Sequence, residues 1–151
     1  MSYLNQILDK ARSLDTRIVL AEGEDIRVIK AASRAQADGL AHCILVGDQE
    51  KIAAQAVKNG ISLGSLQLED PKYSTHTAAY CDRLVELRQH KGMTPEQARE
   101  QVLDPLCFAD LMVNNEHADG SIAGALYTTG DRIRSALQII GVAEGFDTVS
   151  S

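Results

Sequence analysis

The sequence predicts an α/β fold in which a mostly parallel sheet of about four or five strands is covered by helices on both faces. Four short apolar segments, at residues 17–21, 42–47, 65–68 and 120–125, have the length and bounding turn residues of buried strands. The stretches between them carry apolar residues at helical spacing. Alternating strands and helices of this kind form parallel sheets, so we expect three αβα layers.

The first part of the chain predicts a helix followed by a β-α-β unit. Apolar residues at helical spacing predict a helix over residues 7–14, and residues 17–21 predict the first strand. The acidic residues that come next favour the start of a helix, which ends at Gly39, and residues 42–47 predict the second strand. The loop at residues 21–25 contains neither GxGxxG nor GxxxxGK[ST], so a dinucleotide or nucleoside triphosphate has no motif here.

The middle of the chain adds a third β/α unit and two further helical segments. Residues 49–58 predict a helix, residues 65–68 a strand and residues 73–90 a long helix. Thr94 is expected to cap the next helical segment, which breaks at Pro105. The apolar residues expected in the core of that segment are Leu103, Leu106, Phe108, Leu111, Met112 and Val113.

Arg88 lies on the apolar face of the predicted helix 73–90, together with Cys81 and Leu84. One interpretation is that it complements the helix dipole in the last turn before Gly92 and extends its stem out of the core. The other is that it faces an anionic ligand. The spacing alone supports both.

Residues 120–134 predict a buried strand, a loop of small residues and a helix start that carries two arginines. Backbone N–H groups at a helix N-terminus bind phosphate, and Arg132 and Arg134 lie about 100° to either side of Ile133, so either can turn toward the loop. Thr128 and Asp131 also fit a capping box, which explains the polar residues without a ligand. The apolar residues expected to seat this helix on the core are Ile133, Leu137 and Ile140.

Composition and charge narrow the classes of function. A net charge of -6 without a basic run disfavours nucleic acid as a partner. Three cysteines and four histidines show no metal-ligand spacing, no GxSxG motif is present, and the cysteines are expected to be small buried residues. No signal peptide or membrane-length apolar run is seen, so we expect a cytoplasmic protein without a membrane partner.

Five segments stand out together, at residues 20–27, 45–47, 87–92, 124–134 and 136–140. They resemble the phosphate acetyltransferase family, in the family's order, and the resemblance extends across residues 3–151. The resemblance implies transfer of an acetyl group between coenzyme A and inorganic phosphate, with no metal or other cofactor. It also implies two α/β domains like those of isocitrate and isopropylmalate dehydrogenases, in a homodimer, with residues 1–151 as a fragment that forms the amino-terminal domain.

The resemblance also implies roles for particular residues. Arg88 and Arg134 match arginines that the family uses for coenzyme A and phosphate groups, and guanidinium groups bind phosphate oxygens bidentately. Thr128, Thr129 and Gly130 stand where the family often has a serine-rich loop. The family's catalytic Ser-Arg pair and aspartate have no counterpart in this sequence, so no catalytic residue is assigned and the chain alone is expected to be inactive.

Other functions remain open at this stage. Phosphate butyryltransferase differs by the room left for a longer acyl chain, which no residue here decides. A domain that senses acetyl-CoA without catalysis, as in bifunctional malic enzymes, is a second alternative, and a scaffold role is a third. The start at residues 1–3 favours a free amino terminus, and residues 143–151 suggest a turn into a further strand.

Overall fold

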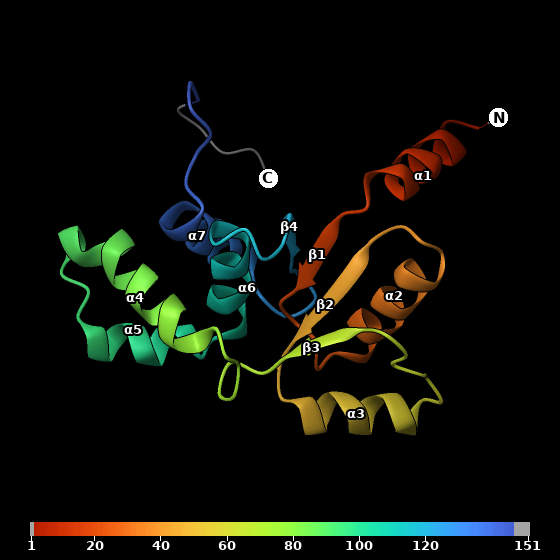
Figure 1. Cartoon of the computed structure of the whole chain (residues 1–151), viewed down its shortest axis with the longest axis horizontal. Coiled ribbons are helices and arrows are strands. Elements are labelled where there is room, and N and C mark those ends of the chain that lie inside the picture. The colour runs from red at the N-terminus through yellow and green to blue at the C-terminus, as the bar shows by residue number, and fades with distance from the viewer. Residues whose placement is uncertain (1, 147–151) are drawn as a thin grey trace.

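The computed structural model describes residues 2–146, which form a four-stranded sheet between two layers of helices (Figure 1). The strand order is β3-β2-β1-β4, and every neighbouring pair is parallel. The predicted α/β class is confirmed. The elements are α1 (Tyr3–Leu14), β1 (Arg17–Leu20), α2 (Ile26–Ala37), β2 (His42–Val46), α3 (Gln49–Lys58), β3 (Gln67–Glu69), α4 (Thr77–Arg88), a 3-10 helix (Gln89–Lys91), α5 (Pro95–Val102), α6 (Pro105–Asn114), β4 (Gly120–Ile122) and α7 (Thr129–Ile139).

The two faces of the sheet are buried by different helices because side chains alternate along a strand. Val19, Ile44 and Val46 point to the layer formed by α4 to α7. Leu20 and Leu45 point the other way and pack with α2 and α3. Burial on both faces explains why the central strands read as continuous apolar runs.

Side-chain caps fix several helix starts that the sequence predicts. The Thr94 hydroxyl accepts the N–H of Gln97, whose side chain accepts the N–H of Thr94 in return, and Pro105 begins α6 after the break. Asp15, in the left-handed conformation, ends α1 where expected. The structure confirms these boundaries. The sequence could predict them because hydrogen bonds between neighbouring residues determine them.

The long helix begins later than the sequence suggests, at Thr77 instead of residue 73. The carbonyl of Asp70 accepts the N–H groups of Tyr73 and Ser74, which closes a turn. The Ser74 hydroxyl then accepts the His76 N–H, so the polar side chain keeps the backbone out of a helix. β3 and β4 are also shorter than expected, and most of the suspected last strand lies outside the described residues.

Three of the predicted core positions are wrong. Leu103, Leu137 and Ile140 are 43%, 44% and 43% exposed, whereas Phe108 is fully buried as expected, as are Leu106, Leu111 and Met112. On α7 the buried apolar residue is Ile139. The other predicted core residues here, Ile133 and Val113, are partly buried.

Two hydrogen bonds explain why α7 has this orientation. Ser135 of α7 donates to the buried Asp110 of α6, and Asn114 of α6 donates to the carbonyl of Ile139. This turns the face of α7 that carries Ser135 and Ile139 toward α6. All three cysteines are buried as expected, and burial raises the pKa of each thiol.

His117 lies in a partly buried aromatic group beneath α4. The hydroxyl of the buried Tyr80 is 2.6 Å from His117 Nδ1, and the His76 and His117 ring centroids are 4.3 Å apart. Burial lowers the pKa of His117, the charges of His76 and Arg17 lower it further, and Glu69 opposes this. The folded protein therefore keeps His117 neutral to a lower pH than the unfolded chain does.

We expect the free energy of unfolding to fall as the pH drops below about 6.5, because the unfolded chain then binds the proton more tightly. The His117 contribution is fully present above that pH. Thermal denaturation between pH 7.5 and 5.5 measures it. His117→Asn keeps a polar acceptor without titrating, so its melting temperature should fall less over this range; equal slopes would contradict the assignment.

Candidate ligand-binding site

The loop that follows β4 and the segment that follows β1 meet at one edge of the sheet. β1 and β4 are parallel neighbours, so residues 21–25 and 123–128 leave the sheet side by side. Open α/β sheets bind their ligands at the carboxyl ends of the strands. The predicted phosphate-binding loop is therefore on the edge where such sites occur.

A buried carboxylate occupies the backbone amides of this loop. Glu22 is only 5% exposed, and its carboxylate accepts the N–H groups of Gly124 at 2.6 Å, Ala125 at 3.0 Å and Tyr127 at 3.0 Å, and that of Leu126 as well. Burial alone would raise the pKa of Glu22, but the four N–H groups lower it overall. The carboxylate is thus ionised, and these amides already hold an anion.

The start of α7 forms the predicted capping box. The Thr128 hydroxyl accepts the Asp131 N–H at 3.1 Å and donates to the Asp131 carboxylate at 2.8 Å. Among the described residues, the N–H groups of Thr129 and Gly130 make no hydrogen bond. Those two N–H groups are the donors that the helix N-terminus still offers to a ligand.

The two arginines of α7 point to different places. Arg132 turns to the loop and donates to the Ala123 carbonyl and the Thr129 hydroxyl, both at 3.2 Å. Its Nε is buried and has no partner in the described part of the chain. Gly124 has a φ of +138°, and a Cβ there would lie 3.4 Å from the guanidinium carbon. The glycine therefore leaves room for Arg132 to lie against the loop.

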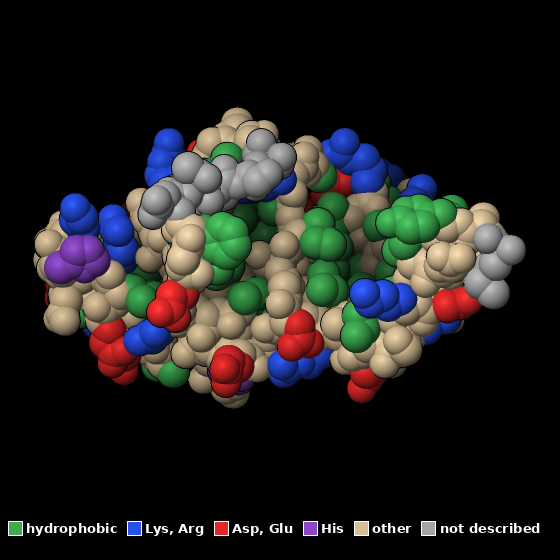
Figure 2. All heavy atoms as spheres, turned by 90° about the horizontal axis from the view of Figure 1, so that it is seen from above, with side chains coloured by type: hydrophobic (Ala, Val, Ile, Leu, Met, Phe, Trp, Pro, Cys, Tyr) green, Lys and Arg blue, Asp and Glu red, His purple; other side chains and the backbone are tan. Residues whose placement is uncertain are grey.

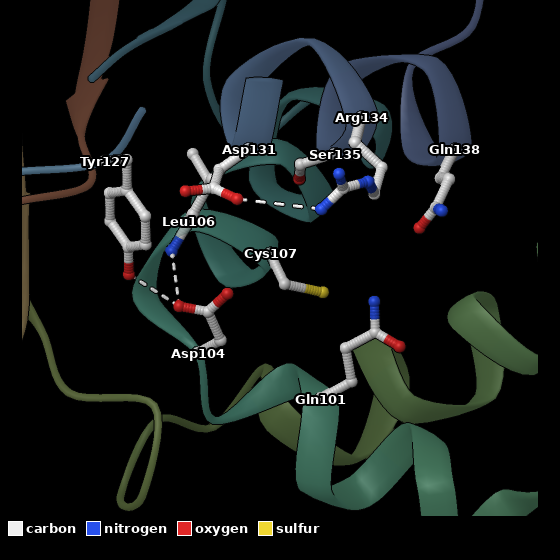
Figure 3. Close-up of a pocket in the computed structure, with 9 residues that line it drawn as sticks. All are labelled: Gln101, Asp104, Leu106, Cys107, Tyr127, Asp131, Arg134, Ser135 and Gln138. Atoms are coloured by element: carbon white, nitrogen blue, oxygen red, sulfur yellow. Dashed lines mark hydrogen bonds and ion pairs between the residues drawn. The ribbon is translucent and has the colours of Figure 1, made fainter. Parts of the chain in front are cut away.

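Arg134 lines a pocket of about 320 Å³ between α5, α6 and α7 (Figure 3). Its guanidinium points toward Asp131 at 3.6 Å, in an exposed pair that contributes little to stability. On the other side of the pocket, the Tyr127 hydroxyl donates to Asp104, the N-cap of α6, at 2.5 Å. The side-chain amides of Gln101 and Gln138 complete a polar rim around Arg134.

Asp110 is a second buried carboxylate, and no sequence pattern indicated it. It is 2% exposed in a mostly apolar helix and accepts hydroxyl hydrogen bonds from Ser121 at 2.8 Å and Ser135 at 2.5 Å. Burial raises its pKa, against the effect of the two serines. It joins β4, α6 and α7 and lines a pocket of about 280 Å³ with Arg132.

Arg88 is not among the residues that line the Arg134 pocket. It ends α4, which contacts α7, and within the described residues it forms no ion pair. Its Nε is buried without a hydrogen-bond partner there. Thr128, Thr129 and Gly130 form the start of the helix that carries Arg134, but they do not line the Arg134 pocket. The structure leaves both interpretations of Arg88 open.

The described residues contain no group of three or more His, Cys, Asp or Glu side chains that could hold a metal ion. In that same part of the chain, no helix has both the length and the apolar character needed to cross a bilayer.

The fold and this pocket define an α/β domain with arginines and a helix N-terminus at the end of the sheet. Residues 2–151 match the model of the phosphate acetyl/butaryl transferase family, and the chain belongs to that family.

Named relatives agree with this assignment. A phosphate acetyltransferase of Acetivibrio thermocellus is 43% identical over 100% of this chain, and one of Clostridium acetobutylicum is 40% identical over 99%. The crystal structure of a phosphotransacetylase from Streptococcus pyogenes superposes on 98% of the chain with a TM-score of 0.91 at 30% identity. The chain spans 45% of the length of each of the first two and 46% of the third.

Proposed function

We propose that this chain is the amino-terminal domain of a phosphate acetyltransferase, which interconverts acetyl-CoA and phosphate with coenzyme A and acetyl phosphate. The observation that carries the proposal is similarity to phosphate acetyltransferases at 40% and 43% identity over essentially the whole chain. In this reaction a phosphate oxygen attacks the thioester carbonyl, the carbon–sulfur bond breaks, and the coenzyme A thiol takes up a proton.

The role proposed for this domain is to bind the phosphate-bearing parts of the substrates. The unpaired N–H groups of Thr129 and Gly130 and the guanidinium of Arg134 are suited to phosphate oxygens. The Thr128 hydroxyl supports them by capping the helix. Arg88 is proposed to bind coenzyme A or phosphate beside them, and no cofactor is required.

Exposed apolar side chains support the presence of a second domain. Figure 2 shows hydrophobic side chains in the middle of the upper face and at the end where α1 lies. No residue of α1 is buried, although one of its faces is apolar. A further domain that covers such surface would also supply the acid-base and oxyanion groups that this chain lacks. The exposed residues are Tyr3, Leu4, Ile7 and Leu14 on α1, with Ile122, Leu126, Leu137 and Ile140.

We further propose that the whole protein is a cytoplasmic enzyme of acetate metabolism and a homodimer, as the family resemblance implies. The absence of a basic run in the sequence supports the absence of a nucleic-acid partner. Size-exclusion chromatography with light scattering on the full-length protein tests the assembly.

We expect the full-length protein to form acetyl phosphate from acetyl-CoA and phosphate, and the 151-residue chain to form none. Positioned acid-base and electrostatic groups each contribute orders of magnitude in rate, and those of the family are missing here. The activity of each protein, full-length and 151-residue, is measured as release of free thiol from acetyl-CoA and from butyryl-CoA. Faster turnover of butyryl-CoA would identify a phosphate butyryltransferase. Acetyl-CoA binding without turnover would identify a sensor, and turnover by the 151-residue chain would contradict the division of roles.

A further inference from the structure

The segment of residues 20–27 contacts a loop about 100 residues away in sequence, and the proposed function gives it no role. In addition to the loop N–H groups that donate to Glu22, the Ala125 carbonyl of the loop accepts a hydrogen bond from the Arg27 guanidinium at 3.1 Å. Asp25 holds that guanidinium through two hydrogen bonds, at 2.7 and 3.0 Å, and caps α2. The segment after β1 therefore forms hydrogen bonds to both N–H and C=O groups of the loop after β4.

We propose that Glu22 is a positioning residue whose buried carboxylate acts as an internal anion and holds residues 124–127 in the substrate-binding conformation. Arg27 supports the same conformation from the carbonyl side. This inference rests on the proposed function, because it concerns how that substrate site is built.

The conformation of the loop depends on an anion. Four consecutive N–H groups that converge on one carboxylate place their dipoles side by side, which only a negative charge stabilises. Without Glu22, four half-buried donors would lose their partner, and each unsatisfied donor destabilises that conformation. The φ of +138° at Gly124 also has to be maintained.

Apolar packing holds this loop at its two ends, where Ala123 and Tyr127 pack against the core, but not in between. Leu126 is exposed, and Tyr127 is only partly buried and is tied by its hydroxyl to Asp104. Glu22 lies at the loop and not in the apolar core of the sheet. Loss of the carboxylate should therefore disorder the loop before it unfolds the domain.

The carboxylate also determines where a substrate phosphate binds. Since Glu22 fills the amides of residues 124–127, the substrate phosphate is left with the N–H groups of Thr129 and Gly130, which come next in the chain. Arg134 lies about one turn further along the same helix. The loop leads directly into these residues, so its conformation sets their positions. Displacement of the loop would raise the Michaelis constants more than it changes the turnover number.

The test uses Glu22→Gln, Glu22→Asp and Glu22→Ala in the full-length protein. We expect Glu22→Gln to raise the Michaelis constant for phosphate or coenzyme A at least tenfold and to speed hydrogen exchange of the amides at residues 124–127, with kcat changed less. Glu22→Asp keeps the charge and should recover part of the affinity. Glu24→Gln is the matched control, because Glu24 accepts one N–H, that of Asp48 at 2.9 Å, away from this loop; it should leave these constants unchanged.

Added formate should lower the raised Michaelis constants of Glu22→Ala, since a small carboxylate can occupy the vacated amides, whereas chloride at equal ionic strength should not. If Glu22→Ala does not fold, the Michaelis constants and amide exchange rates of Glu22→Gln and Glu22→Asp test the inference. Michaelis constants and exchange rates that are unchanged in Glu22→Gln would overturn the inference, as would equal losses in Glu22→Asp and Glu22→Gln. A wild-type protein that transfers no acetyl group would instead refute the proposed function, and amide exchange in these variants would still show whether Glu22 holds the loop.

Discussion

Replacement of Gly23 by alanine is expected to lower the free energy of unfolding by about 3 kcal/mol or to prevent folding. Gly23 is buried between Glu22 and β2, and its N–H donates to the Val46 carbonyl at 3.0 Å. A Cβ at this position would lie 2.7 Å from that oxygen and 3.0 Å from the Leu45 Cβ. Both neighbours belong to a central strand, so neither can move without disturbing the sheet.

Gly120→Ala is the control for this prediction. Gly120 begins β4, and a Cβ there would lie 3.5 Å from the end of the Ile18 side chain, an ordinary contact. Urea denaturation of the two variants should show a large loss for Gly23→Ala and a change below about 1 kcal/mol for Gly120→Ala. Similar losses in both variants would contradict the steric explanation.

The sequence predicts those parts of the fold that local hydrogen bonds and apolar periodicity determine. The cap at Thr94 and the end of α1 at Asp15 depend on neighbouring residues, and they occur where expected. Leu137 and Ile140 match a helical stripe equally well, yet they are exposed. Their orientation follows from the bond between Ser135 and Asp110, 25 residues apart, which no local pattern contains.

The same distinction applies to the candidate site. The loop and the capping box of Thr128 were predicted from local sequence, whereas Arg134, which lies beside a pocket, was singled out only by the family resemblance. Glu22 was read only as part of an acidic helix start, because its four partners lie more than 100 residues away. The signal available was an acidic residue directly after a buried strand, on the edge where ligands bind. Its pairing with the loop could be found only once the strand order was known.

We expect Arg134→Ala and Arg88→Ala in the full-length protein to weaken apparent affinity for coenzyme A or phosphate by roughly 1.5 to 3 kcal/mol each, the range of a charge-assisted hydrogen bond. For Arg134 the melting temperature should change little, because its pair with Asp131 is exposed and 3.6 Å long. Lysine keeps the charge but lacks the bidentate fork, so the lysine variants should also lose affinity. Arg99→Ala is the control, since Arg99 is a helix-surface arginine that pairs with the nearby Glu96.

Arg88 is the stricter test, because the two interpretations of this residue predict opposite results. If it only complements the dipole of α4, Arg88→Ala should lower the melting temperature and leave both Michaelis constants unchanged. If it binds substrate, its buried Nε, which has no partner within residues 2–146, gains one when the ligand is present. The Michaelis constants should then rise in the variant while the melting temperature of the free protein stays nearly the same. Steady-state kinetics and thermal denaturation of the same preparations separate the two. Unchanged kinetics in the alanine and lysine variants of both arginines would reject this site while leaving the family assignment intact.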